Sequence, residues 1–172
     1  RFTHPIGLHL LGTDLYVADF LNHRVRKVAT GTRLTSLVAG NGVEGNMDGP
    51  GQLAHVSHPS GLTAHVGTGV VYVSCVVIDA VRKILPDNSI VTIAGVGRNT
   101  PAFADGVGVL AALIGPLGIS LDSNGLLYVA CYHEPGLRVI DTANSNLVTT
   151  FATALVAPYG VYVSPDGSAV YV

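Results

Sequence analysis

A short motif recurs four times along this chain and constrains its fold more than any other feature. Each copy begins Pro-x-Gly-apolar and leads, 11 to 13 residues later, into a tyrosine followed by valine. The prolines are Pro5, Pro59, Pro116 and Pro158, and the tyrosines are Tyr16, Tyr72, Tyr128 and Tyr171. A repeat spaced by several tens of residues is typical of propellers, solenoids and other arrays. We therefore expect one structural unit to be used several times.

Each unit contains four short apolar and β-branched runs separated by turn residues. The innermost strands are expected at Leu8–Leu10, Leu62–Ala64, Ile119–Leu121 and Val161–Val163, each pairing with the Tyr-Val strand that follows it. Third strands follow at 24–28, 80–84 and 136–140, and fourth strands at 34–39, 90–94 and 147–152. Four strands per repeat are typical of a propeller blade. The sequence thus predicts an all-β propeller of four-stranded antiparallel blades.

Composition supports this fold class and argues against several functions. Hydrophobic residues make up 48% of the chain and charged residues 12%, while 21 glycines and 9 prolines separate the apolar runs. That pattern is typical of many strands and turns packed in layers. The net charge is −2 and the nine Lys and Arg are mostly scattered, which argues against nucleic acid as a partner. The apolar runs fall short of the roughly 18 residues that a membrane-spanning helix needs.

The spacing of the repeats indicates that residues 1–172 form part of a ring. The four prolines lie 54, 57 and 42 residues apart, and the fourth copy reaches Val172 after two strands. Propellers close with about four to eight blades. We therefore expect about three and a half blades, starting near the four prolines, of a ring completed by further residues of the same protein or by a neighbouring chain. The first arrangement is favoured.

The first repeat resembles the repeats of the NHL family. It carries Tyr-Val-Ala-Asp at Tyr16–Asp19 and Asn-His-Arg-Val-Arg-Lys at Asn22–Lys27. The resemblance implies a propeller, commonly of six blades. The second and third repeats depart from this pattern, with cysteine at the Asp19 position and Asp79 and Pro135 at the His23 position.

The signature residues of the first repeat allow two interpretations. Asp19, Asn22, His23 and Arg24 are expected to form hydrogen bonds that hold the turn between the second and third strands. The alternative is that Asn22 and His23 touch a ligand. The cysteines, Cys75 and Cys131, occupy equivalent positions on successive blades, which is too far apart for a disulfide. Two free, buried thiols are expected.

The resemblance implies three classes of function, namely a lyase with a metal near the central channel, an RNA-binding module, and an interaction module. The sequence contains no HExxH, zinc-type Cys/His spacing, Ser-His-Asp arrangement or phosphate-binding loop. We therefore predict no catalytic residue, metal ligand or cofactor. His9 aligns with Thr63, Ser120 and Tyr162, so this polar line either approaches the channel or packs between blades. A non-enzymatic interaction or scaffolding module is favoured, with the lyase and RNA classes as alternatives.

The partner is expected to be a protein or a glycan bound at the face that carries the long loops. In a propeller, the turns between second and third strands share a rim with the connections from each outer strand to the next blade. The connections at 41–57 and 96–115 are much longer than hairpin turns, and long ordered loops are often functional. Asp48 and Asp105 recur with glycine and are expected to form turns. The candidate partner-binding residues are Glu44, Arg98, His133, Glu134, Asn22 and His23. The sequence leaves the compartment open.

Overall fold

The computed structural model describes residues 1–95, 103–134, 136–164 and 166–172, and it contains three four-stranded antiparallel blades followed by a two-stranded sheet. Blade one consists of β1 (Pro5–Leu11), β2 (Asp14–Asp19), β3 (Arg24–Ala29) and β4 (Thr35–Ala39). Blade two consists of β5 (Pro59–His65), β6 (Val70–Cys75), β7 (Ala80–Ile84) and β8 (Ile90–Ala94). Blade three consists of β10 (Pro116–Leu121), β11 (Leu126–Cys131), β12 (Gly136–Asp141) and β13 (Leu147–Thr153). The fourth sheet pairs β14 (Tyr162–Val163) with β15 (Val170–Tyr171).

The remaining elements lie in the connections. Single turns of 3-10 helix link the second and third strands of the first two blades, and a third precedes blade three. They are η1 (Phe20–Asn22), η2 (Val76–Ile78) and η3 (Gly108–Leu110), and the short strand β9 (Gly106–Val107) pairs with the outer edge of β13. No helix among the described residues is long and apolar enough to cross a membrane.

The observed strands confirm the predicted fold class. In every copy the strand that starts at or near Pro-x-Gly pairs antiparallel with the Tyr-Val strand, as in β1 with β2, β5 with β6, β10 with β11 and β14 with β15. Strands β1, β5 and β10 begin three residues earlier than predicted, and the other bounds differ by at most one residue. The total blade number of the ring stays a prediction.

The glycines of the first three Pro-x-Gly motifs, Gly7, Gly61 and Gly118, lie where adjacent blades approach backbone to backbone. A Cβ added to Gly7 would lie 2.0 Å from the carbonyl oxygen of Ser60, and one on Gly61 would lie 2.4 Å from that of Leu117. Any larger residue would push the two inner strands apart. The repeated glycine is therefore explained by packing between blades.

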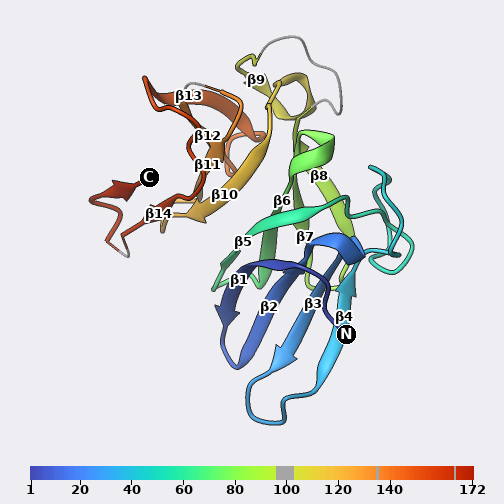
Figure 1. Ribbon diagram of the computed structural model, residues 1–172. Coiled ribbons are helices and arrows are strands. Elements are labelled where there is room, and N and C mark those ends of the chain that lie inside the picture. The colour runs from blue at the N-terminus through green and yellow to red at the C-terminus, as the bar shows by residue number, and fades with distance from the viewer. Residues whose placement is uncertain (96–102, 135, 165) are drawn as a thin grey trace.

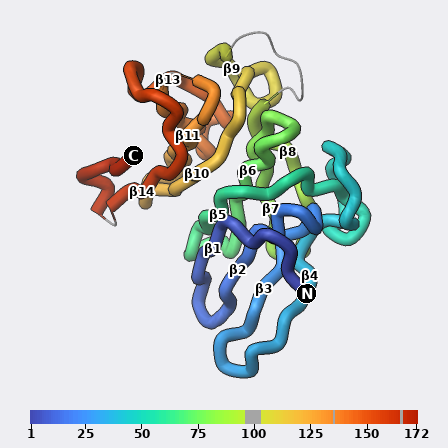
Figure 2. The backbone as a smooth tube through the Cα atoms, in the orientation of Figure 1, coloured from blue at the N-terminus to red at the C-terminus, as the bar shows by residue number. Residues whose placement is uncertain are grey.

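The blades stack side by side through apolar layers. Figures 1 and 2 show blade one at the bottom, blade two in the middle and blade three above, with the inner strands β1, β5 and β10 following one another. One layer contains residues of blades one and two, such as Val25 and Val73, and the next contains residues of blades two and three, such as Val81 and Val129. Apolar packing thus joins blade one to blade two and blade two to blade three.

The two ends of this stack expose residues that neighbours cover in the middle. Leu8 of blade one is 59% exposed, whereas its equivalent Leu62 is 6% exposed because blade one packs against it. At the other end Tyr171 is 61% exposed, whereas its equivalent Tyr128 is 6% exposed. Large exposed apolar faces mark sites of association. The two ends of the stack are therefore exposed apolar surfaces of the kind at which proteins associate.

Residues 1–172 produced as an isolated chain are expected to self-associate, because both ends present apolar blade faces to water. Sedimentation velocity over a range of concentrations measures this directly. Replacing Leu8 and Leu10 with lysine should lower the association, whereas Val66→Lys, on the exposed turn between β5 and β6, should not. A concentration-independent monomer with a cooperative melt would contradict the prediction.

Candidate functional site

An arginine in the third strand of each blade has the same register, and in blades two and three it organises the rim that carries the loops. Arg26, Arg82 and Arg138 lie opposite Val17, Val73 and Val129 of the second strands. The side chains of Arg82 and Arg138 are 0% and 1% exposed. A buried guanidinium needs an opposite charge and hydrogen-bond acceptors, and the loops that precede blades two and three supply both.

Arg82 holds the loop between blades one and two against blade two. Its guanidinium donates to the backbone carbonyls of His55 and Met47 and forms an ion pair with Asp48. The Asp48 carboxylate also accepts the backbone N–H of Thr92, from β8, with Oδ2 at 2.9 Å. Burial raises the pKa of Asp48, but the hydrogen bonds from Thr92 and Arg82 outweigh it and leave the pKa below its ordinary value.

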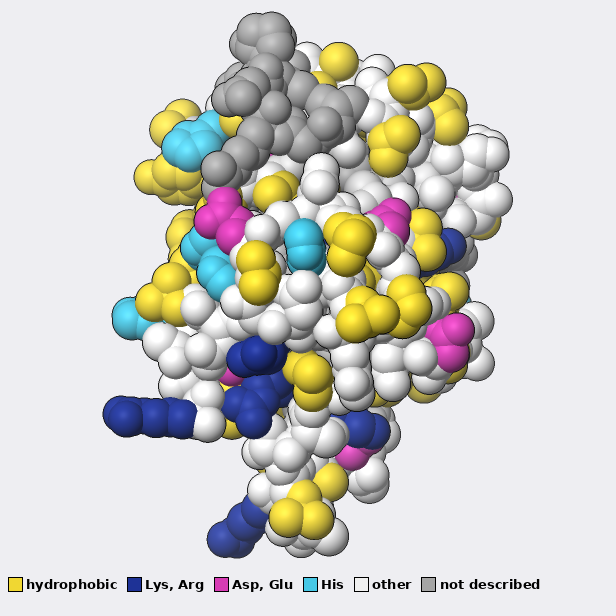
Figure 3. All heavy atoms as spheres, turned by 90° about the vertical axis from the view of Figure 1, so that its right-hand side faces the viewer, with side chains coloured by type: hydrophobic (Ala, Val, Ile, Leu, Met, Phe, Trp, Pro, Cys, Tyr) yellow, Lys and Arg dark blue, Asp and Glu magenta, His cyan; other side chains and the backbone are white. Residues whose placement is uncertain are grey.

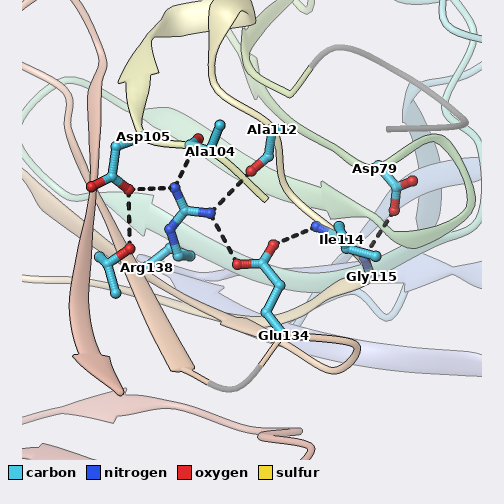
Figure 4. Close-up of polar contacts among 9 residues, drawn as sticks. Asp79, Ala104, Asp105, Ala112, Ile114, Gly115, Glu134 and Arg138 are labelled. Atoms are coloured by element: carbon cyan, nitrogen blue, oxygen red, sulfur yellow. Dashed lines mark hydrogen bonds and ion pairs between the residues drawn. The ribbon is translucent and has the colours of Figure 1, made fainter. Parts of the chain in front are cut away.

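Arg138 makes the matching contacts in blade three (Figure 4). It donates to the carbonyl oxygens of Ala104 and Ala112, each at 3.0 Å, and forms an ion pair with Asp105 at 2.7 Å. Asp105 also accepts the hydroxyl of Thr150, from β13, at 3.0 Å. Asp48 and Asp105 were expected to form turns, and the structure instead gives them the role of joining a loop to a buried arginine and an outer strand.

The glycine after each of these aspartates closes the outer edge of the blade. Gly49 exchanges backbone hydrogen bonds with Ile90 of β8, and Gly106 of β9 pairs with Val148 of β13. Each loop is therefore attached to its blade both through an ion pair with a buried arginine and through backbone pairing. This attachment fixes residues 46–55 and 104–112 of the two loops against the rim.

A second polar contact recurs beside the arginines with different residues. In blade one, Asp19 accepts the backbone N–H of Thr3 at 2.7 Å and lies 3.6 Å from the guanidinium of Arg26. In blade three, Cys131 replaces that aspartate, and Glu134, three residues later, accepts the N–H of Ile114 at 2.5 Å.

Glu134 is a second carboxylate, beside Asp105, that forms an ion pair with Arg138 in blade three. Its Oε2 lies 2.9 Å from the Arg138 guanidinium, and the residue is 3% exposed (Figure 4). Glu134 was expected on the partner-binding surface. Its buried position corrects that expectation, because its carboxylate is engaged inside the blade.

The two cysteines are free and buried, as predicted. Burial raises the pKa of Cys75 to about 12, although the positive charge of Arg82 and a hydrogen bond from the Ser57 backbone act in the opposite direction. Burial also raises the pKa of Cys131 well above its ordinary value, and the negative charge of Glu134 adds to this. Neither thiol has the low pKa and accessibility of a reactive cysteine.

Both thiols are expected to resist alkylation in the folded protein at pH 8, because the thiolate is scarce and the sulfur inaccessible. Iodoacetamide labelling followed by mass spectrometry should find unmodified Cys75 and Cys131 before unfolding and both modified in denaturant. Rapid labelling of either cysteine in the native protein would contradict this account of the site.

Glu134→Gln is expected to lower the free energy of unfolding by about 3 kcal/mol, because it leaves a buried guanidinium without part of its compensating charge. Chemical denaturation measures the change. Glu44→Gln is the matched control, since Glu44 lies on the surface and exposed ion pairs contribute about 0–1 kcal/mol. Equal stability of the Glu134→Gln variant and the wild type would show that the pair is not needed.

In blades one and two, the turn between the second and third strands ties the blade to the next one. His23 Nδ1 accepts the backbone N–H of His58 at 3.3 Å, and Asp79 Oδ1 accepts that of Gly115 at 2.8 Å. His23 and Asp79 share a left-handed backbone, with φ of 53° and 51°. The two different side chains therefore play one role between blades.

The other candidate residues divide into internal and exposed groups. Asn22 donates to Asp19 at 2.8 Å and to the carbonyl oxygen of Arg1 at 3.2 Å, so Asn22 and His23 both make structural contacts. Glu44 and His133 are exposed at the rim. Arg98 lies outside the described residues. Sequence reasoning missed the buried arginines, although the same register of Arg26, Arg82 and Arg138 was a usable signal.

The polar line on the inner strands lies between blades at two of its positions. Thr63 and Ser120 are 6% and 9% exposed, and Ser120 accepts the N–H of Val163 from the next blade at 3.0 Å. Burial lowers the pKa of His9. Within the described part of the chain, no three His, Cys, Asp or Glu side chains are grouped so that they could hold a metal ion.

The loop-bearing face combines mixed polar groups with a hollow. Figure 3 shows histidine, acidic and apolar side chains interspersed, with Lys and Arg gathered toward the lower end, where blade one lies. The hollow has a volume of about 360 Å³. It is lined by Asn46, Asp48, Ile78, Ala80, Thr92, Gly95 and Val109.

Known proteins resemble this chain in sequence and in fold. No protein-family model matches the sequence. Over 152 residues the chain is 30% identical to Protein SUPPRESSOR OF QUENCHING 1, chloroplastic, from Arabidopsis thaliana, an alignment that covers 81% of this chain and 14% of that protein. The chain thus spans only a small part of this curated relative.

Solved structures with the same arrangement are β-propellers. A Bacteroides thetaiotaomicron protein of unknown function aligns with a TM-score of 0.74 and 18% identity, over 96% of this chain and 46% of its own. An auxiliary nutrient binding protein of the same species aligns with a TM-score of 0.70 and 14% identity, over 92% of this chain and 42% of its own. Virginiamycin B lyase from Staphylococcus aureus aligns with a TM-score of 0.63 and 16% identity, over 91% of this chain and 44% of its own. This chain has the β-propeller fold and spans less than half of each of these proteins.

Proposed function

We propose that this chain belongs to an NHL-repeat propeller and acts as a non-enzymatic interaction or scaffolding module. Its partner, a polypeptide or a glycan, binds at the loop-bearing face. The observation that carries this proposal is the anchoring of two long loops by Arg82 and Arg138, which holds mixed polar side chains in place on one rim. A preorganised polar surface reduces the entropy lost on binding.

In this proposal, the blades of this chain start near Pro5, Pro59, Pro116 and Pro158. Further residues of the same protein complete the ring. The exposed apolar faces at both ends of the stack support it, because such faces are covered between blades. The length of the solved propellers also supports this arrangement, because this chain spans only 42% to 46% of the three propellers described above.

A lyase-type enzyme with a metal near the central channel is the second candidate. The shared fold of virginiamycin B lyase favours it, although at 16% identity the likeness concerns the fold alone. Such an enzyme needs convergent metal ligands, and the described residues contain no group of that kind. RNA binding is the third class, and it is disfavoured because only nine Lys and Arg are present, with Arg82 and Arg138 buried in ion pairs.

Replacing Glu44, Arg98 and His133 together with alanine is expected to weaken partner binding while leaving the melting temperature nearly unchanged. Glu44 and His133 are exposed at the rim, and surface substitutions usually change stability by under about 0.5 kcal/mol. Partners captured by the wild-type protein under cross-linking are quantified by mass spectrometry and compared with those captured by the variant.

The control for this experiment is substitution of Thr68 and Asn124, which lie in turns between first and second strands on the opposite face. Unchanged capture by the rim variant, together with loss in the control, would place the partner on the other face and contradict the proposal.

A further inference from the structure

The arginines of the third strands are bound to different extents, and blade three shows the fullest arrangement (Figure 4). Arg138 has a carboxylate on each side of its guanidinium, Glu134 from the turn at Nη1 and Asp105 from the loop at Nη2. Nη1 also donates to the carbonyl oxygen of Ala112, four residues before Pro116. Two carboxylates and the backbone of the preceding loop thus enclose this arginine.

Blade one repeats one half of this arrangement at Arg26. Its Nη1 donates to the carbonyl oxygen of Arg1, four residues before Pro5, at 3.1 Å. The carboxylate of Asp19 lies 3.6 Å from the same nitrogen and has the role that Glu134 has in blade three. The turn side of the guanidinium is therefore bound as it is in blade three.

The other side of the Arg26 guanidinium is accessible. In blades two and three, Nη2 is the atom that binds the loop aspartate, Asp48 or Asp105. Among the residues that the structure describes, Nη2 of Arg26 has no hydrogen-bond acceptor. The Arg26 side chain is 21% exposed, whereas those of Arg82 and Arg138 are 0% and 1% exposed. Arg26 therefore presents one donor group to the surface of blade one.

The outer edge of β4 beside this donor is also unpaired among the described residues. In blades two and three the glycine after the aspartate pairs with the outer strand, Gly49 with Ile90 and Gly106 with Val148. Both outer-strand residues are buried. Thr35 has the same register in β4 and is exposed. Unpaired strand edges accept further backbone pairing, so β4 offers blade one the contact that closes the edges of the other two blades.

The loops bound at this position in blades two and three share a motif and a spacing. Asp48 and Asp105 each open the sequence Asp-Gly-x-Gly. Each lies seven residues before the residue whose carbonyl oxygen binds the same arginine. Arg1 is that residue in blade one. A segment of the same motif leading into Arg1 would bring its aspartate to Arg26 and its glycine to Thr35.

We propose that Arg26 and the outer edge of β4 form a docking site for an Asp-Gly-x-Gly segment that leads into Arg1. The aspartate accepts hydrogen bonds from Nη2 of Arg26, and the following glycine pairs with β4. Figure 3 shows Lys and Arg gathered toward the end where blade one lies, and this positive charge favours an acidic occupant. The site lies at the edge of blade one and does not depend on which partner binds the loop-bearing face.

A second copy of this chain is a poorer occupant of the site. The sequence contains the motif Asp-Gly-x-Gly twice, at Asp48 and Asp105. Both aspartates are already bound by the arginine of their own blade. A second copy would have to release one of these ion pairs and leave a buried guanidinium without its partner, which is costly.

A copy of residues 46–54 joined to the intact chain in front of Arg1 tests the site, because it places an aspartate seven residues before Arg1. The matched control is the same extension with alanine in place of that aspartate. Amide hydrogen exchange over β4, followed by mass spectrometry, is the measurement. Docking would give the outward N–H groups of β4 an acceptor, as Asp48 does for Thr92 in blade two. Strand β8 is the internal reference, since its own loop already covers it.

Exchange of the β4 amides is expected to be about tenfold slower with the aspartate extension than with the alanine extension, the effect of one hydrogen bond to a charged group. Exchange in β8 should be the same in both. Arg26→Met is expected to remove the difference between the two extensions. Arg33→Met should preserve it, because Arg33 is an exposed residue of the turn between β3 and β4 and carries the same charge.

Equal exchange of β4 with the two extensions would overturn the docking site, and so would a difference that persists in Arg26→Met. The comparison of the two extensions leaves Arg26 in place, so it decides the inference even if the Arg26→Met variant unfolds. Slow exchange of β4 in the unextended chain that depends on protein concentration would assign this edge to a second copy and would also overturn the proposal.

Discussion

The buried arginine of the third strand is the interaction on which the rest of the rim depends. In blades two and three it lies in the apolar layer of its own sheet, where an uncompensated charge would cost several kcal/mol. Arg82 and Arg138 recover this cost by binding an aspartate and backbone carbonyls of the preceding loop. The arginine thereby fixes the loop, and the fixed loop covers both the outer edge of the blade and part of its rim.

The repeat conserves contacts while it exchanges the residues that make them. The backbone N–H two residues before the blade proline is met by Asp19 in blade one and by Glu134 in blade three. The link to the next blade is made by His23 in one case and by Asp79 in another. Glu134 stands three residues after Cys131, which occupies the position of Asp19. Its longer side chain still reaches the equivalent backbone N–H, so the contact is kept although the residue that makes it has changed place.

Function on such a scaffold comes from local departures from the repeat. Blades two and three share the same anchor, yet the residues around it differ, with Ile78 in blade two at the place of Glu134 in blade three. The buried thiols, in contrast, are departures without accessible chemistry, because burial holds their pKa high. Exposure, more than residue type, separates the binding candidates from the structural residues here.

The period of Pro-x-Gly and Tyr-Val was enough to predict the strands, their pairing and the blades, because strand order depends on patterns within about 50 residues of sequence. The burial of the cysteines also followed from their place in the repeat. The sequence left the buried role of Glu134 undetermined. Arg82 meets an aspartate 34 residues away, and Arg138 one 33 residues away. Such contacts depend on the path of a loop over a folded sheet, which no local pattern specifies, so only the tertiary structure decided them.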